Sequence, residues 1–359
     1  MLALRLARGS RPLVQLRRLL VAAASAGTGF LLLYVLAGAL DRPAGSFPRL
    51  LWALVPLAAT VQFAVAVART DPSTRPREGL DAVGLGPVRL TLVAAISTAV
   101  ACTLGSALAL AAFLHLRGDL AGLPFDGAGA ALLHADRPLP VAAALTLLAL
   151  VPLSASAAAG LALRPGTRRP LAPQTALPWG IALTACGLAV EAYAGRGGAG
   201  MLTGWSLTAV GLALAGPGLA YACGTLVQAV RPGALRLLAG RALQQEASRL
   251  GPPLGVLCAI GAGALSALAL RDRGGLLLPL GPLSGPAAVL VALCAAATLL
   301  TSAAEAHQSR AAAQGALLDL GAPAKVLRSA ASLRASALIV VCAPVSWGVA
   351  QLTSMALTR

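Results

Sequence analysis

The sequence predicts an all-α integral membrane protein with about nine transmembrane helices. Hydrophobic residues make up 58% of the 359 residues and charged residues only 11%, whereas a water-soluble domain carries about 25% charged residues. The apolar residues form runs close to the roughly 20 residues that a helix needs to cross the hydrocarbon core of a bilayer. A water-soluble fold is therefore excluded. The nine runs lie at 19–40, 50–68, 89–116, 139–163, 177–194, 201–222, 254–270, 286–304 and 335–356.

The charged residues follow the positive-inside rule over all nine runs. With a cytoplasmic N-terminus, 20 of the 28 Lys and Arg residues fall inside and eight outside. The 12 acidic residues divide equally, so the inside connections carry +14 and the outside connections +2. We therefore expect a multi-pass protein of the cell membrane with its N-terminus in the cytoplasm. Its basic loops then face the anionic lipid bilayer, and we expect no nucleic-acid partner.

Two basic amphipathic stretches precede the first and the seventh run, at residues 2–8 and 234–241. Their apolar residues are spaced by three and four with Arg between them, which suits a helix that lies in the plane of the lipid headgroups. Each stretch taken alone can also be a positive flank that anchors the following span, and their recurrence at matching positions favours the helix. Because the two stretches occupy matching positions, they divide the chain into two similar halves. The fifth and sixth runs lie between these halves.

A second repeat consists of two connections on the predicted cytoplasmic side, 77–89 before the third run and 310–328 before the ninth. Setting Gly84 on Gly321 aligns Leu80 with Leu317. Each connection is predicted to begin as a helix, to break at glycine and to restart near proline at the start of the next run. A short helix joined rigidly to a span can transmit force from a cytoplasmic partner.

The second connection resembles the hallmark of FtsX-like permeases, the membrane subunits of the MacB-type ABC transporter superfamily. That hallmark is a charged helix, an apolar turn that ends in Leu-Gly-Ala, and a basic residue before the next span. Here Arg310 is followed by the turn 316–322, then by Lys325 and Arg328. The first copy, 77–89, matches less closely.

This resemblance implies a domain plan of two four-span FtsX-like repeats joined by a two-helix linker. The first repeat covers 1–163, the linker 164–230 and the second repeat 231–359, which lacks its last span. Many relatives carry a large extracytoplasmic domain, but the longest outside connections here, 117–138 and 271–285, are too short for one.

The resemblance also implies a role in which this chain transmits motion from a separate ABC ATPase to the outer membrane face for export of an amphiphilic substrate. The chain has no GxxxxGK[ST] phosphate loop. We therefore expect it to be no enzyme and to bind no cofactor itself, with ATP and Mg bound by the partner ATPase. A second permease chain is a further candidate partner. The expected ATPase-coupling residues are Arg77, Glu78, Gly84, Arg89, Glu305, Arg310, Gly321, Lys325 and Arg328.

Three alternatives stay open. The coupling residues can be ordinary charges of inside loops, and the chain can be a structural or regulatory membrane protein of the same fold that transports nothing. An enzyme acting on lipid-linked substrates would need clustered polar groups at one membrane face, which only 117–138 approaches. That segment matches no metal-binding pattern, and the six cysteines form no CxxC pair, so we predict no metal or catalytic site.

Few ionisable residues lie within the apolar runs. His115, Glu191 and Arg89 are close to the ends of their runs, where we expect interfacial or snorkelling side chains. Because carriers coupled to protons or sodium generally use carboxylates or broken helices near the midplane, this pattern disfavours a secondary transporter.

Overall fold

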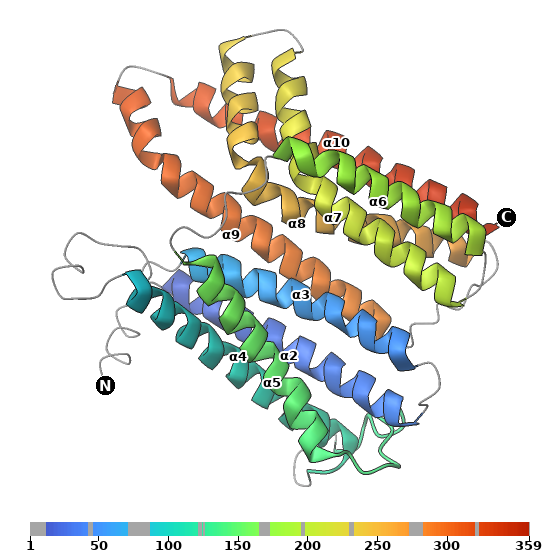
Figure 1. Cartoon of the computed structure of the whole chain (residues 1–359). Coiled ribbons are helices and arrows are strands. Elements are labelled where there is room, and N and C mark those ends of the chain that lie inside the picture. The colour runs from blue at the N-terminus through green and yellow to red at the C-terminus, as the bar shows by residue number, and fades with distance from the viewer. Residues whose placement is uncertain are drawn as a thin grey trace. The chain divides into compact units, whose positions relative to one another are not determined.

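The computed structural model describes residues 12–41, 46–70, 87–120, 124, 126–164, 173–194, 198–229, 233–272, 283–319 and 323–358. Within these ranges all regular structure is α-helical and no residue is in a strand. Figure 1 shows the arrangement of the helices. They are α2 (Pro12–Asp41), α3 (Ser46–Thr70), α4 (Pro87–Arg117), α5 (Val141–Ala162), α6 (Pro173–Ala194), α7 (Gly198–Ala229), α8 (Ala234–Asp272), α9 (Ser284–Asp319) and α10 (Ala324–Thr358).

All nine of these helices contain a stretch long and apolar enough to cross a membrane. Each coincides with one of the nine runs predicted from the sequence. By the length and composition of its helices, the structure confirms the prediction of an all-helical, multi-pass membrane protein. The arrangement in FtsX-like repeats and the side on which the N-terminus lies stay predictions.

The chain divides into two compact units. The first contains 1–168 and 280–294, and the second contains 169–279 and 295–359. In the described part of the chain, α2 to α5 therefore belong to the first unit, and α6, α7, α8 and α10 belong to the second. Helix α9 contributes its first residues to the first unit and the rest to the second.

The first unit is held together by apolar packing and by polar contacts between its helices. Leu33 of α2, Phe113 of α4 and Leu148 of α5 are buried in one cluster. The rings of Phe30 and Phe113 meet edge to face with their centroids 5.5 Å apart, an arrangement that aromatic pairs favour. The Thr28 and Thr60 hydroxyls also form a 2.7 Å hydrogen bond between α2 and α3, the kind of contact that joins helices in lipid.

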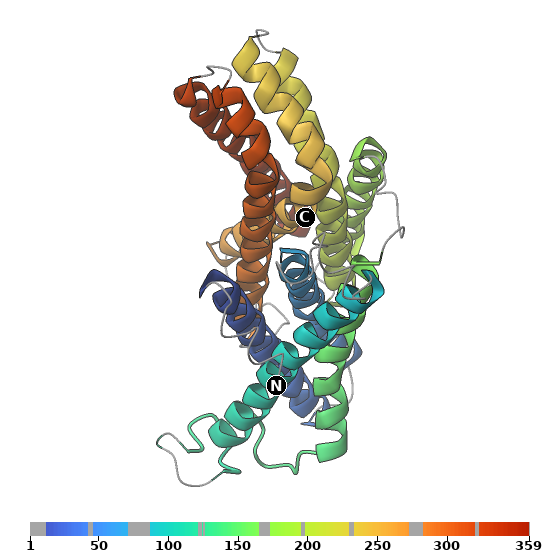
Figure 2. The same cartoon turned by 90° about the vertical axis from the view of Figure 1, so that its left-hand side faces the viewer.

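The second unit is built on close contacts of α7 with α6 and with α8. Both seams are rich in glycine, which allows two helix backbones to approach closely. On α8, Gly251 packs against Pro217 and Gly216 of α7 so tightly that an added methyl group would lie 2.9 Å from the Gly216 carbonyl carbon. The end of α7 and the beginning of α8 run side by side in Figures 1 and 2.

Helix α8 differs from the sequence prediction for residues 234–241. We expected a separate helix in the headgroup plane, but these residues are the beginning of one continuous helix of 39 residues. Pro252 and Pro253 lie inside this helix, and Figure 1 shows that its first part is angled relative to the remainder. Proline causes such bends because it removes a backbone N–H and crowds the preceding turn.

The predicted break in the segment 310–328 is described only at Pro323, which is in no helix, because 320–322 lie outside the described residues. Helix α9 ends at Asp319 and α10 begins at Ala324, directly after Pro323. The equivalent connection in the first half cannot be compared, because 71–86 lies outside the described residues.

Candidate functional site

The second unit contains a group of ion pairs where the beginning of α8, the end of α9 and the beginning of α10 meet. The Glu246 carboxylate of α8 pairs with Arg310 of α9, and Arg334 Nη1 of α10 lies 3.9 Å from Glu246 Oε2. A second pair joins Arg249 of α8 to Glu305 of α9 at 3.8 Å. We call these five residues the charge cluster, and it lies at the end of the helices that the charge rule places in the cytoplasm.

The centre of the charge cluster is largely shielded from solvent. The side chains of Glu246, Arg310 and Arg334 are 12%, 23% and 20% exposed. Arg310 also donates to the Ala242 carbonyl oxygen at 3.4 Å, so it contacts α8 at two successive turns. Removing one partner from such a pair leaves an uncompensated charge. The cluster therefore ties three helices together at one end of the second unit.

The structure brings two of the predicted coupling residues into this cluster, Glu305 and Arg310. Three others, Arg89, Lys325 and Arg328, are exposed. The remaining four lie outside the described residues: Arg77, Glu78, Gly84 and Gly321.

Sequence reasoning missed the three other members of the cluster. The signal was present for Glu246, the one acidic residue in the basic stretch 231–249. An acidic residue among arginines, next to a membrane span, indicates that its carboxylate pairs with a basic side chain. Its partners Arg310 and Arg334 are more than 60 residues away, however, and no local periodicity connects them.

One end of the first unit holds a second set of polar contacts, formed by the segment 117–138 and the end of α2. Arg137 lies 3.9 Å from Asp41 and donates to the Leu40 carbonyl oxygen at 3.3 Å, while Arg117 lies 3.3 Å from Asp119. His134 Nε2 is 3.7 Å from Asp41. These contacts join the end of α2 to the connection between α4 and α5. Across the residues that the structure describes, no three His, Cys, Asp or Glu side chains are placed to hold a metal ion.

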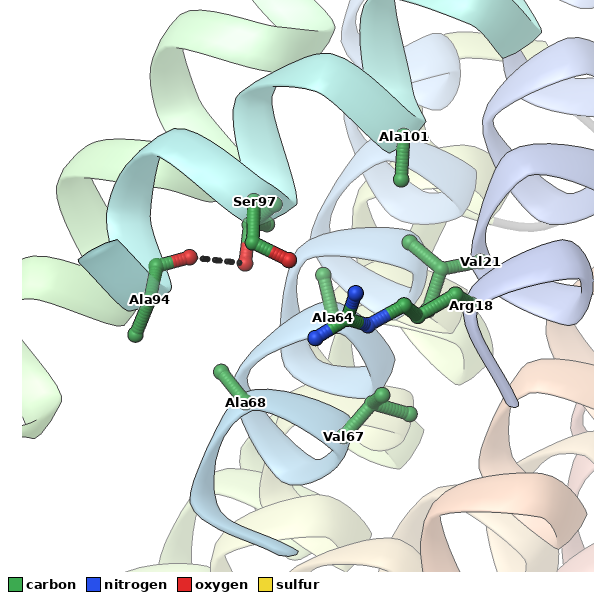
Figure 3. Close-up of a pocket in the computed structure, with 9 residues that line it drawn as sticks. Arg18, Val21, Ala64, Val67, Ala68, Ala94, Ser97 and Ala101 are labelled. Atoms are coloured by element: carbon green, nitrogen blue, oxygen red, sulfur yellow. Dashed lines mark hydrogen bonds between the residues drawn. The ribbon is translucent and has the colours of Figure 1, made fainter. Parts of the chain in front are cut away.

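A small pocket in the first unit is lined by α2, α3 and α4 and contains the side chain of Arg18 (Figure 3). Most of its lining is alanine and valine. The Thr98 hydroxyl donates to the Ala94 carbonyl oxygen of its own helix at 2.9 Å. With one guanidinium group and few other polar groups, the pocket resembles the surroundings of a snorkelling arginine more than a substrate site.

Glu191 contradicts the prediction of an interfacial side chain. It lies one turn from the end of α6, yet its side chain is fully buried. The Thr208 hydroxyl of α7 donates to Glu191 Oε1 at 3.2 Å. The position near the end of the run was read correctly, but burial depends on α7 and α10 packing around that end.

Arg89 and His115, the other two ionisable residues near span ends, are not enclosed in this way. Arg89 is exposed and His115 is partly exposed. His115 Nε2 lies 3.1 Å from the Pro124 carbonyl oxygen, within hydrogen-bonding distance, so the ring is held against the connection that follows α4.

Comparisons of the chain with protein families, with curated proteins and with solved structures find no match. The candidate site therefore rests on the geometry of the chain itself: a shielded charge cluster that joins α8, α9 and α10, and two exposed basic residues, Lys325 and Arg328, in the first turns of α10.

Proposed function

We propose that this chain is the permease subunit of an ABC transporter of the FtsX-like type, and that it transmits motion from a separate ATPase to the outer face of the membrane. The observation that supports this proposal is the charge cluster. It lies beside the segment 310–328, which carries the resemblance, and it joins that segment to α8.

In this proposal the basic residues divide into two roles. Lys325 and Arg328 are exposed in the first turns of α10, so they are the residues that would contact an ATPase. Arg310 is turned toward Glu246 of its own unit and would pass the movement on. Because Glu246 is also close to Arg334 of α10, a displacement of the start of α10 would move α8 and α9 with it.

The proposal is tested by co-expression with the ABC ATPases of the same genome, followed by purification and ATP hydrolysis assays in lipid nanodiscs. The double variant Lys325→Glu/Arg328→Glu should lose the complex while folding normally. The matched control is Asp136→Lys, which reverses an exposed charge in the segment at the predicted outer face and should leave the complex intact. Equal retention of the ATPase by both variants would contradict the docking assignment.

The complex can also form and hydrolyse ATP at the same rate with the wild-type chain and with Glu246→Gln. That result would favour the alternative, a membrane protein that recruits an ATPase without transport. If neither co-expression nor crosslinking in membranes recovers an ABC ATPase, the permease proposal is wrong. The export of an amphiphilic substrate is part of the same proposal and would be measured as ATP-dependent release from vesicles.

A further inference from the structure

Glu191 is a fully buried carboxyl group in the second unit. One oxygen, Oε1, accepts the hydrogen bond from Thr208, whereas Oε2 is buried and has no hydrogen-bond partner. The Thr353 hydroxyl of α10 interacts with the same carboxyl group, and both threonines are themselves buried. The carboxyl is therefore surrounded by neutral hydroxyl groups contributed by two other helices.

No cation in the described part of the unit faces this carboxyl. Helix α6 packs against α7 and α10. Neither α6 nor α7 contains another Asp, Glu, Lys, Arg or His, and the basic residues of α10 lie in its first three turns, whereas Thr353 is near its end. The neighbouring Tyr193 is 98% exposed and directed away. The other titratable residues of these helices lie more than one turn from both Glu191 and Thr353 along the chain: Cys186, Tyr221, Cys223, Lys325, Arg328, Arg334 and Cys342.

Close backbone packing encloses the group. Gly204 of α7 is so near that a methyl group added there would lie 3.0 Å from the Glu191 backbone nitrogen and 2.9 Å from the Gly187 carbonyl oxygen. Gly187 and Gly204 at this seam allow the two helix backbones to lie close together. Solvent therefore reaches the carboxyl only if the helices separate.

We propose that Glu191 is a proton-binding site, a neutral carboxylic acid while α6, α7 and α10 are packed together. A carboxylate that faces no cation among the described residues costs several kcal/mol in such surroundings, and the group avoids this cost by holding a proton. The proton resides on Oε2, the oxygen without a donor, while Oε1 accepts from Thr208. When the ends of the helices separate, the O–H bond breaks, the proton passes to water and the carboxylate becomes hydrated.

The experiment uses the fact that the chain has four glutamates: Glu78, Glu191, Glu246 and Glu305. The full chain is labelled with glutamate carrying ¹³C at the side-chain carboxyl, placed in lipid nanodiscs and examined by NMR at neutral pH. We expect one carboxyl signal at the position of a neutral acid and the others at the position of carboxylates. Glu191→Gln should remove the neutral signal, and Glu305→Gln should remove an ionised one. Four ionised signals in the wild-type protein would overturn the proposal.

A second measurement follows thermal unfolding from about pH 4, where the carboxyl ionises in the unfolded chain, to alkaline pH. Since the neutral form is the one that fits the packed unit, the wild-type protein should lose stability as the pH rises through the ionisation of Glu191. Glu191→Gln mimics the neutral acid, so its midpoint should lack that loss. Parallel curves for both proteins would also overturn the proposal. Neither experiment needs an ATPase, so the outcome is independent of the proposed function.

Discussion

Two glutamates of the second unit, Glu246 and Glu191, are both buried, yet they are surrounded in opposite ways. Glu246 of α8 pairs with Arg310 and lies near Arg334. Glu191 of α6 meets a threonine hydroxyl and has one oxygen without a partner. The first is a charge compensated by charges, and the second fits its site best as an uncharged acid.

This difference shows that burial alone does not assign a role to an acidic residue in a membrane protein. The neighbours decide whether the charged or the neutral form is stabilised. The predictions below test this contrast, from the largest expected effect to the smallest.

The largest effect is expected for Glu246→Ala. It leaves two arginines without their carboxylate in a mostly shielded site, and the loss in stability should be about 3 kcal/mol. Chemical unfolding in detergent measures it. Combining Glu246→Leu with Arg310→Met should recover part of the loss, because a buried ion pair can be replaced by apolar groups, while Arg334 still lacks its carboxylate. A double variant that is less stable than Glu246→Ala would show that the contacts between α8 and α9 depend on the charges.

Gly204→Ala should cost about 2 kcal/mol by forcing α7 away from α6 at Glu191. The matched control is Gly348→Ala on α10, where an added methyl group meets nothing within 4 Å and helix propensity favours alanine. We expect the control to be as stable as the wild type in thermal unfolding. Equal midpoints for the two variants would mean that the seam yields without strain.

Thr208→Val should cost about 1 kcal/mol, the value of one buried hydrogen bond. It also removes the donor to Glu191 Oε1, so the effect should shrink in a Glu191→Ala background. A double-mutant cycle on unfolding free energies measures the coupling. Zero coupling would argue that Thr208 does not hold the carboxyl.

The smallest effect is expected for Arg249→Gln. Arg249 is 56% exposed, so its pair with Glu305 contributes about 0.5 kcal/mol and weakens with salt. Unfolding at low and high ionic strength checks this. A loss comparable to that of Glu246→Ala would show that the charge cluster acts as one unit.

The fold class could be predicted from the sequence because length and hydropathy are local properties. All nine runs coincide with helices, and Pro323, the proline of the predicted break, lies between α9 and α10. The continuity of α8 could not be anticipated, since a basic amphipathic stretch suits either a separate helix or the extension of a span.

The candidate site was predicted only in part, because its contacts join distant residues. Arg310 and Glu305 were identified as charged residues of an inside connection, but Glu246, the partner of Arg310, belongs to a different helix far earlier in the chain. Glu191 was placed at the end of a span, and only the packing of α7 and α10 shows that this end is closed to solvent. One-dimensional patterns report which segment a residue belongs to, and not what surrounds it.

The prolines of α7 and α8 lie at one level, since Gly251 packs against Pro217 directly before Pro252 and Pro253. Each proline leaves the carbonyl four residues earlier without its helical donor, which affects Ala213, Ser248 and Arg249. Both helices of this hairpin therefore lack backbone hydrogen bonds at the same level, and both are easiest to bend there. A change of bend at this level would move the first part of α8, which carries Glu246, relative to the part of α8 that follows Pro253.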